Sequence, residues 1–176
     1  MRGSGDVILR GANSKISSHE RDFAKNPVLL VSACLMGRPC RYNGTHCHNG
    51  AIEALARVYT LLPVCPEVLG GLRTPRQPCE QRDGRVYTRD GQDVTGAFEA
   101  GCAKALELAL EHGVTLAILK EKSPSCGTKQ VYDGSFRDRL VPGNGMMTRL
   151  LLENGIDVIS NEDVFEIDAL GRREEA

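Results

Sequence analysis

The stretch of sequence that decides the fold is VLLVSACLMG, residues 28–37. Its first four residues form an apolar run with β-branched side chains, which is typical of a strand buried on both faces of a sheet. Comparable short apolar runs recur at residues 61–64, 116–119 and 156–159, and helical patterns separate them. Because strand–helix alternation favours right-handed crossovers, the sequence predicts an α/β fold with a mostly parallel sheet and helices on both faces.

Three helices and one hairpin are expected between these runs. Asn49, Thr95 and Asn144 are candidate N-caps, since each precedes apolar residues at helical spacing. Gly113 is the expected C-terminal stop of the longest helix. An Asp-Gly turn between two strand-like runs predicts a β-hairpin over residues 86–94.

The composition is that of an ordinary globular protein, and it excludes several classes. The chain has 176 residues, with 22 basic and 23 acidic side chains and 5% aromatic residues. Balanced charge and so few aromatic rings argue against a nucleic-acid polymer as partner. No apolar run is long enough to span a bilayer, and the first 26 residues lack the apolar core of a signal peptide. We therefore expect no membrane partner and a cytoplasmic location.

The length of the chain predicts one domain. Residues 1–26 are polar without apolar periodicity, and a disordered leader is expected there. The folded domain is expected over residues 27–170, followed by a charged tail over residues 171–176.

Cysteine is the residue type that stands out, with seven copies. Cys34, Cys65 and Cys126 each follow an apolar strand-like run, directly or after a short loop. The carboxyl ends of parallel strands face a common crevice, so three thiols distant in sequence can converge there. In a reducing cytosol such cysteines indicate metal binding or catalysis more often than disulfides, and three soft thiolates suit zinc or an iron–sulfur cluster. Ordinary buried thiols are the alternative interpretation.

Five segments of the chain are recognisable together. In order they are VSACLMGRPCRYNG, CPEVLGGLRTPRQP, DGQDVTGAF, LKEKSPSCGTKQVYDGSF, and VPGNGMMTRLL followed by GIDVIS, within about residues 28–161. Their conjunction resembles the thiouracil desulfurase family. The resemblance implies a Rossmann-like desulfurase domain that binds a [4Fe–4S] cluster through Cys34, Cys65 and Cys126, with one iron left open. It also implies an enzyme that cleaves a carbon–sulfur bond without redox chemistry, converting a small thiolated uracil compound into a uracil-type product and sulfide.

Glu67 and Ser123 are the candidate catalytic residues. Glu67 follows Cys65 by two residues, and a carboxylate there could activate water or return a proton to the departing heterocycle. By the resemblance it matches a catalytic glutamate, and Ser123 matches a serine of the family's active site. Ser125 is a candidate donor of a hydrogen bond to a cluster sulfur and also a candidate substrate contact. A capping or salt-bridging glutamate and turn-forming serines are the structural alternatives.

The remaining cysteines have simpler interpretations. Cys102 lies on the apolar face of a predicted helix and is expected to pack in the core. Cys79 is taken as incidental, and Cys40 as a residue that could line the cluster pocket. The His-Cys-His tract at residues 46–48 resembles a small zinc site but is interpreted as a surface loop.

A turn and two arginines are candidate substrate contacts. Gly143-Asn144-Gly145 opens the third predicted helix, and free amides at helix N-termini bind anions. Arg38 and Arg41 could add positive charge at the mouth of the crevice. Together these residues would hold the phosphate of 4-thiouridine monophosphate, making it a better substrate than 4-thiouridine or thiouracil. A plain N-cap and solvated arginines are the alternative interpretation.

Two other functions compete with the desulfurase hypothesis. A zinc hydrolase could use three cysteines and a water molecule, but all-thiolate zinc sites are usually structural. A cluster-bearing or zinc-binding regulatory or structural protein would lack catalysis, and it would need no glutamate beside the metal. No GxGxxG pattern follows the first predicted strand, so no nicotinamide site is expected.

Overall fold

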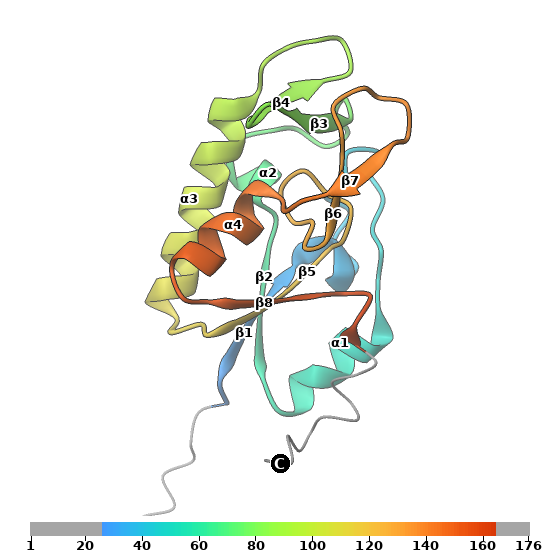
Figure 1. The fold of residues 1–176 in the computed structure, drawn as a ribbon. Helices are drawn as coiled ribbons and strands as arrows, with labels where there is room; N and C mark the ends of the chain where they lie inside the picture. Colours follow the sequence, from blue (N-terminus) through green and yellow to red (C-terminus); the bar gives the residue numbers. More distant parts are fainter. Residues whose placement is uncertain (1–25, 165–176) are drawn as a thin grey trace, which may run out of the picture.

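Four parallel strands form the central sheet of the computed structural model, which describes residues 26–164 (Figure 1). Their order across the sheet is β2-β1-β5-β8. The strands are β1 (Val28–Ser32), β2 (Thr60–Val64), β5 (Leu116–Leu119) and β8 (Asp157–Ser160). All three pairings are parallel, and Leu30 of β1 is in register with Leu62 and Ala117. The predicted α/β fold and its four strands are confirmed.

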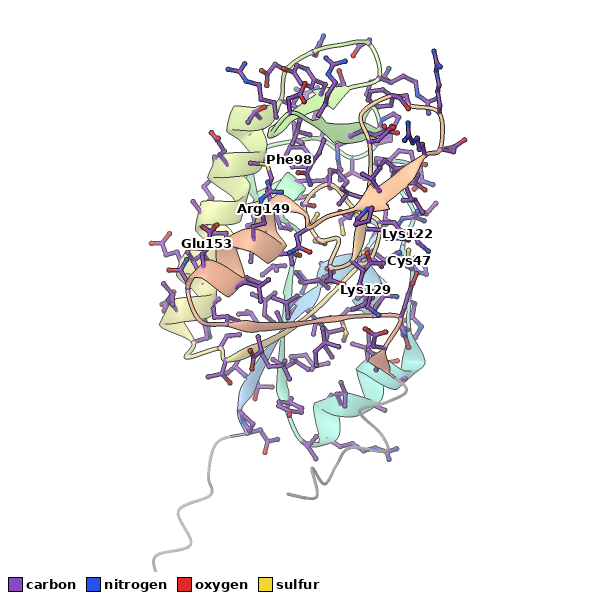
Figure 2. The ribbon with its side chains drawn as sticks, viewed as in Figure 1. Cys47, Phe98, Lys122, Lys129, Arg149 and Glu153 are labelled. Atoms are coloured by element: carbon purple, nitrogen blue, oxygen red, sulfur yellow. The ribbon has the colours of Figure 1, made fainter. Side chains whose placement is uncertain are left out.

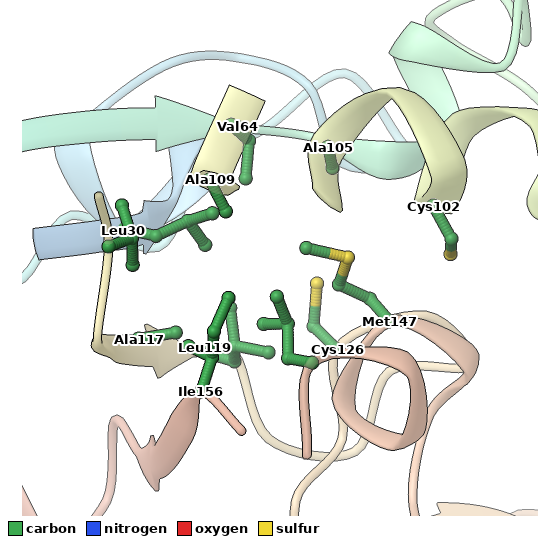
Figure 3. Close-up of a cluster of buried hydrophobic side chains, with 12 residues drawn as sticks. Leu30, Val64, Cys102, Ala105, Ala109, Ala117, Leu119, Cys126, Met147 and Ile156 are labelled. Atoms are coloured by element: carbon green, nitrogen blue, oxygen red, sulfur yellow. The ribbon is translucent and has the colours of Figure 1, made fainter. Parts of the chain in front are cut away.

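Helices cover both faces of this sheet, as the sequence predicts. On one face, α3 (Thr95–Glu111) and α4 (Met146–Glu153) pack on a cluster of buried side chains from β1, β2 and β5 (Figures 1 and 3). On the other face, Leu29, Val31 and Ile118 meet Ile52 of α1 (Gly50–Ala54). A 3₁₀ turn, η2 (Leu55–Arg57), continues α1 towards β2.

The helix ends follow the sequence in part. Asn49 caps α1, since its side chain accepts a hydrogen bond from the Ala51 amide at 3.0 Å. α3 ends before Gly113, which has a φ of +63°. The expected caps of the other two helices are wrong. Thr95 is the first residue of α3, which follows Val94 without a side-chain cap, and the Asp93 carboxylate accepts the Thr95 amide at 2.9 Å. α4 begins after Gly145, also without a side-chain cap.

Two antiparallel hairpins lie beyond the carboxyl ends of the parallel strands (Figure 1). They are β3 (Cys79–Arg82) with β4 (Arg85–Thr88), and β6 (Gln130–Tyr132) with β7 (Leu140–Pro142).

The first of these hairpins differs from the one expected over residues 86–94. Its turn is Asp83-Gly84, where both residues have positive φ, as a two-residue turn of type I′ requires. The expected hairpin is reduced to a single bridge between Tyr87 and Asp93. Arg149 of α4 (Figure 2) donates a hydrogen bond to Gln81 Oε1 on β3 at 3.1 Å, so the hairpin is fastened to the helix layer.

Several predictions about the chain ends lie outside the described residues. The expected leader (residues 1–26) lies outside them apart from residue 26. The expected end of the domain at residue 170 and the tail over residues 171–176 lie outside them entirely. Among residues 26–164, no helix is long and apolar enough to cross a membrane.

Candidate active site

A cavity of about 290 Å³ lies at the carboxyl ends of the parallel strands, below the two hairpins. Cys34 lies in a 3₁₀ turn, η1 (Ala33–Met36), directly after β1, and Cys65 follows β2 directly. Cys126 lies in the loop after β5. All three cysteines line the cavity, so the structure brings together the thiols that follow three neighbouring strands.

Two more cysteines, Cys40 and Cys79, line the same cavity. Hydrogen bonding with the Cys34 thiol is the main reason why the pKa of Cys40 rises to about 11. Cys40 in turn raises the pKa of Cys65, and burial adds to that rise. Burial raises the pKa of Cys126 to about 12. Cys40, Cys65 and Cys126 are therefore neutral thiols near pH 7, and a bound metal would displace the protons of those that ligate it.

Cys126 lies where the cavity meets the buried cluster of the sheet. It is 6% exposed, and Figure 3 shows it beside Met147 of α4. In the part of the chain that the structure describes, no three His, Cys, Asp or Glu side chains are grouped as ligands of a single metal ion. The thiols of Cys34, Cys65 and Cys126 lie around one cavity instead, and soft donors of this kind fit the chemistry of an iron–sulfur cluster.

The loop that carries Cys126 folds around the buried carboxylate of Glu121. This residue is 2% exposed, and its carboxylate accepts hydrogen bonds from the amides of Thr128, Lys129 and Gln130 and from the Thr128 hydroxyl. Burial by itself would raise the pKa of Glu121, but these hydrogen bonds outweigh burial and lower the pKa to about 2. An ionised carboxylate therefore fixes the shape of the loop at neutral pH.

Two ion pairs fasten this loop to the segment after β8. Lys122 pairs with Glu162 at 3.1 Å, and Lys129 pairs with Asp163 at 2.6 Å. Figure 2 shows both lysines on the same side of the molecule. Because the four side chains are at least partly exposed, each pair adds little to the stability of the fold. The pairs mainly restrict where the loop lies.

The start of α4 holds the same loop from the opposite side. Its first amides donate hydrogen bonds to three carbonyl groups: Gly145 to Gly127 at 2.8 Å, Met146 to Pro124 at 3.0 Å and Met147 to Ser125 at 2.9 Å. A Cβ atom on Gly145 would lie 2.4 Å from the Ser125 carbonyl, so only glycine permits this approach. The amides at the start of α4, which the sequence predicts as phosphate ligands, therefore already donate hydrogen bonds to carbonyl groups of the protein. The turn Gly143-Asn144-Gly145 builds the Cys126 loop and does not line the cavity.

The two arginines of the first motif also differ in position. Arg41 lines the cavity, and its guanidinium donates a hydrogen bond to Thr45 Oγ1 at 3.2 Å. Arg38 is exposed and lies outside the cavity lining. Arg41 and Ser125 are therefore the predicted substrate contacts that reach the cavity.

Glu67 lies on α2 (Pro66–Leu69), a short helix that starts directly after Cys65. Its Oε1 accepts a hydrogen bond from the Ser125 hydroxyl at 3.0 Å. Its Oε2 accepts a hydrogen bond from Arg76 Nε at 2.8 Å and forms an ion pair with Arg76 Nη2 at 2.6 Å. The side chains of Glu67 and Arg76 are only 12% and 9% exposed, so the carboxylate is held from both sides within the cavity wall.

Close packing of α2 on α3 fixes the position of Glu67. A Cβ atom on Gly101 of α3 would lie 1.8 Å from the Pro66 carbonyl oxygen, and one on Gly70 would lie 2.0 Å from the Ala97 carbonyl oxygen. Two glycines therefore let the backbones touch, and α3 serves as the platform for the helix that carries Glu67.

A chain of hydrogen bonds leads from Glu67 to Ser123. Ser125 Oγ lies 3.1 Å from Ser123 Oγ and 3.7 Å from Cys126 Sγ. The Ser125 hydroxyl has one proton, which it gives to Glu67, so Ser123 is the donor in the contact between the two serines. Ser123 Oγ also accepts the Cys126 amide at 3.1 Å. The structure thus places Ser125 between the two predicted catalytic residues.

Arg76 and Glu80 line the cavity but were not singled out from the sequence. Arg76 lies in the TPRQP part of one of the five recognised segments, nine residues after Glu67. Its place in that segment was the sequence signal that could have identified it. Glu80 is 8% exposed, and its Oε2 accepts the amides of Gly134 and Phe136 at 3.0 and 2.9 Å. It joins the two hairpins above the cavity, and no sequence pattern indicates that link.

Cys102 and Cys40 lie as interpreted, whereas Cys79, interpreted as incidental, lies at the start of β3 in the cavity wall. Cys102 is 2% exposed in the cluster under α3, and Cys40 lines the cavity. The tract at residues 46–48 is a loop before α1, where His48 pairs with Glu53 at 2.9 Å.

Comparisons with known proteins agree with one another. A model of the 2-thiouracil desulfurase family matches residues 29–163. The uncharacterized protein YbbK of Bacillus subtilis (strain 168) is 39% identical in an alignment 150 residues long, which covers 80% of this chain and 99% of YbbK. The solved structure of the [4Fe-4S]-dependent thiouracil desulfidase TudS (DUF523Vcz) is 41% identical, with a TM-score of 0.77, over 81% of this chain and 96% of TudS.

Proposed function

The chain belongs to the 2-thiouracil desulfurase family, and we propose that it removes sulfur from thiolated uracil compounds by a non-redox reaction. The observation that carries this proposal is the meeting of three strand-end thiols with the carboxylate of Glu67 on one cavity. The net reaction replaces a carbon–sulfur double bond by a carbon–oxygen double bond. It consumes water and releases hydrogen sulfide, so no electrons are exchanged.

The proposed cofactor is a [4Fe–4S] cluster held by Cys34, Cys65 and Cys126. The relative TudS is described as [4Fe-4S]-dependent, and the three thiols are soft ligands of the type that such a cluster requires. When bound, the cluster supplies an iron without a protein ligand, a Lewis acid that polarises the thiocarbonyl group. Burial of Cys126 against Met147 shields this side of the site from solvent.

Glu67 is the proposed general base. Its Oε1 accepts one hydrogen bond from Ser125 and has a second lone pair for a water molecule in the cavity. The carboxylate takes a proton from this water, which attacks the electron-poor ring carbon. Ser125 and Ser123 extend the path by which a proton returns to the ring or to the departing sulfur.

The proposed substrates are small molecules: thiouracil, 4-thiouridine or 4-thiouridine monophosphate. Arg41 is the predicted basic residue that reaches the cavity, and Arg89 and Lys122 also line it. A comparison of kcat/KM for the three compounds on one sample decides among them. A charge-assisted contact with the phosphate would favour the nucleotide about tenfold or more. Equal values would exclude that contact and leave the desulfuration itself intact.

We also propose a cytoplasmic location, because of the chemistry of the cysteines. All seven cysteines are free thiols, and a thiol-rich site with an iron–sulfur cluster is compatible with a reducing compartment.

Anaerobic reconstitution with iron and sulfide, followed by an assay on thiouracil, tests the proposed function. We expect a brown protein that releases one sulfide for each uracil formed. A colourless protein that retains zinc would contradict the cluster. A brown protein without turnover on any of the three compounds would support a regulatory role instead.

A further inference from the structure

We infer that Arg76 is a positioning residue that orients the catalytic carboxylate of Glu67 towards Ser125 and the cavity. The inference rests on the proposed role of Glu67. It starts from the contact between the two side chains, in which both Nε and Nη2 of Arg76 approach a single oxygen, Oε2, at 2.8 and 2.6 Å. Oε1 is thereby left to face the Ser125 hydroxyl at 3.0 Å.

The guanidinium of Arg76 is itself fixed by its other donors. Nη2 donates to the Cys40 carbonyl at 3.0 Å, and Nη1 donates to the Arg73 carbonyl at 3.2 Å and to Thr74 Oγ1 at 3.0 Å. Only a planar group with five N–H donors can satisfy these acceptors together with a carboxylate. Arg76 therefore ties Glu67 to the loop of Cys40 and to its own loop at once.

The other arginines on the cavity do not play this part. Arg41 donates to Thr45, and Arg89 lies over the ring of Phe136 at 5.9 Å. In the described part of the chain, Arg76 is the one arginine of the cavity lining that forms an ion pair. A glutamate on a helix as short as α2 has several rotamers, and the pair with Arg76 selects the one that reaches Ser125.

Kinetic coupling between Arg76 and Glu67 tests the inference. Arg76→Gln, Arg76→Lys, Glu67→Gln and the double variant Glu67→Gln/Arg76→Gln are compared after anaerobic reconstitution. We expect Arg76→Gln to lower kcat roughly 10- to 100-fold with KM changed less than about twofold, as for a misplaced catalytic group. Arg76→Lys should recover part of the loss. In the Glu67→Gln background, Arg76→Gln should change kcat less than about twofold, because the group that it positions is already absent.

Two controls separate positioning from a general structural role. Iron and sulfide per chain should equal the wild-type content in every variant, and Arg85→Gln should leave kcat unchanged, since Arg85 forms an exposed pair with Asp93. A loss of the same size in the Glu67→Gln background, or a fall in cluster content in step with kcat, would show that Arg76 only maintains the fold.

Crystal structures of the wild type and of Arg76→Gln give a readout that does not depend on turnover. We expect the Ser125 Oγ to Glu67 Oε1 contact near 3.0 Å in the wild type and its loss in the variant. An unchanged contact in Arg76→Gln would overturn the inference. Absence of turnover in the reconstituted wild type would instead contradict the proposed function, and the structural comparison would still decide the role of Arg76.

Discussion

Glu67 is the residue on which the proposed chemistry depends, because it is the carboxylate of the cavity wall that contacts both Ser125 and Arg76. Glu80 and Glu121 also line the cavity, but their oxygens accept backbone amides and so maintain loops. A carboxylate is a poor ligand for a soft iron–thiolate site, so Glu67 should be dispensable for cluster assembly.

Replacement of Glu67 by glutamine should abolish proton transfer and keep the shape of the site. We expect turnover to fall at least about 100-fold, the usual scale for a positioned acid–base group, with iron and sulfide content unchanged. Steady-state sulfide release measures the effect. Glu107→Gln, an exposed site on α3, is the matched control and should retain full activity. Near-normal turnover of a fully reconstituted Glu67→Gln protein would remove Glu67 from the mechanism.

At this scale the sequence revealed part of the site. The positions of Cys34, Cys65 and Cys126 could be predicted because a strand end is visible as the point where an apolar run stops. The contact of Glu67 with Arg76 could not, because it depends on the path of the irregular loop between α2 and β3, and no periodicity records that path. The Ser125 contact spans 58 positions of sequence and depends on another irregular loop, the one between β5 and β6.

The loop between β5 and β6 is the element that presents Cys126 and both serines, and Glu121 is its internal anchor. Glu121→Gln should destabilise the fold by about 1.5–3 kcal/mol at pH 7, the scale of hydrogen bonds to a charged group. The NH₂ group of the glutamine would also face backbone N–H groups, which are donors and need an acceptor. Urea unfolding at pH 7 measures the difference, and exposed Glu111→Gln is the control.

The sign of the pH dependence follows from the lowered pKa of Glu121. The folded-state value is about 2 against an ordinary value of 4.5, so ionised Glu121 stabilises the protein fully above about pH 4.5. This stabilisation is lost as the pH falls from about 4.5 to about 2. The Glu121→Gln variant should lack that part of the acid destabilisation. An identical pH dependence in both proteins would show that the carboxylate does not anchor the loop.

Packing between α2 and α3 gives a second prediction for the elements. Gly101→Ala places a methyl group 1.8 Å from the Pro66 carbonyl oxygen, so α2 must move and carry Glu67 with it. We expect a loss of about 1–3 kcal/mol in the free energy of unfolding, together with reduced turnover. Gly96→Ala on the same helix meets nothing within 4 Å and should be neutral or slightly stabilising. Equal stability of the two variants would contradict this packing.

The elements themselves were predicted unevenly, and the reason is physical. Strands of the parallel sheet carry continuous apolar runs, because both faces are buried, and all four were predicted. β3, β6 and β7 are short and partly exposed, so their sequences carry little pattern. Thr95 and Asn144 are typical capping residues, yet neither caps its helix: the Thr95 hydroxyl accepts the Val86 amide, and Asn144 precedes Gly145, which occupies the N-cap position of α4.

In the whole molecule, the parallel sheet and the two hairpins contribute different parts of the cavity. The carboxyl ends of the parallel strands supply the three thiols and the segments that carry Glu67, Ser123 and Ser125. The hairpins lie above these strand ends (Figure 1). The cavity wall includes Cys79 and Glu80 of the first hairpin and Tyr132 and Asp138 of the second. The sheet end thus supplies the three thiols of the proposed cluster site, and the hairpins add residues to the cavity wall.

The central claim is that Cys34, Cys65 and Cys126 together hold one [4Fe–4S] cluster that is needed for turnover. The most direct test uses single Cys→Ser variants after anaerobic reconstitution. Two quantities are measured for each variant: the iron and sulfide content per chain, and the rate of sulfide release from substrate. Serine at any of these three positions should abolish the cluster and activity, whereas Cys79→Ser and Cys102→Ser should retain both. A Cys40/Cys79/Cys102 triple serine variant that lost the cluster, while Cys34→Ser kept it, would contradict the account.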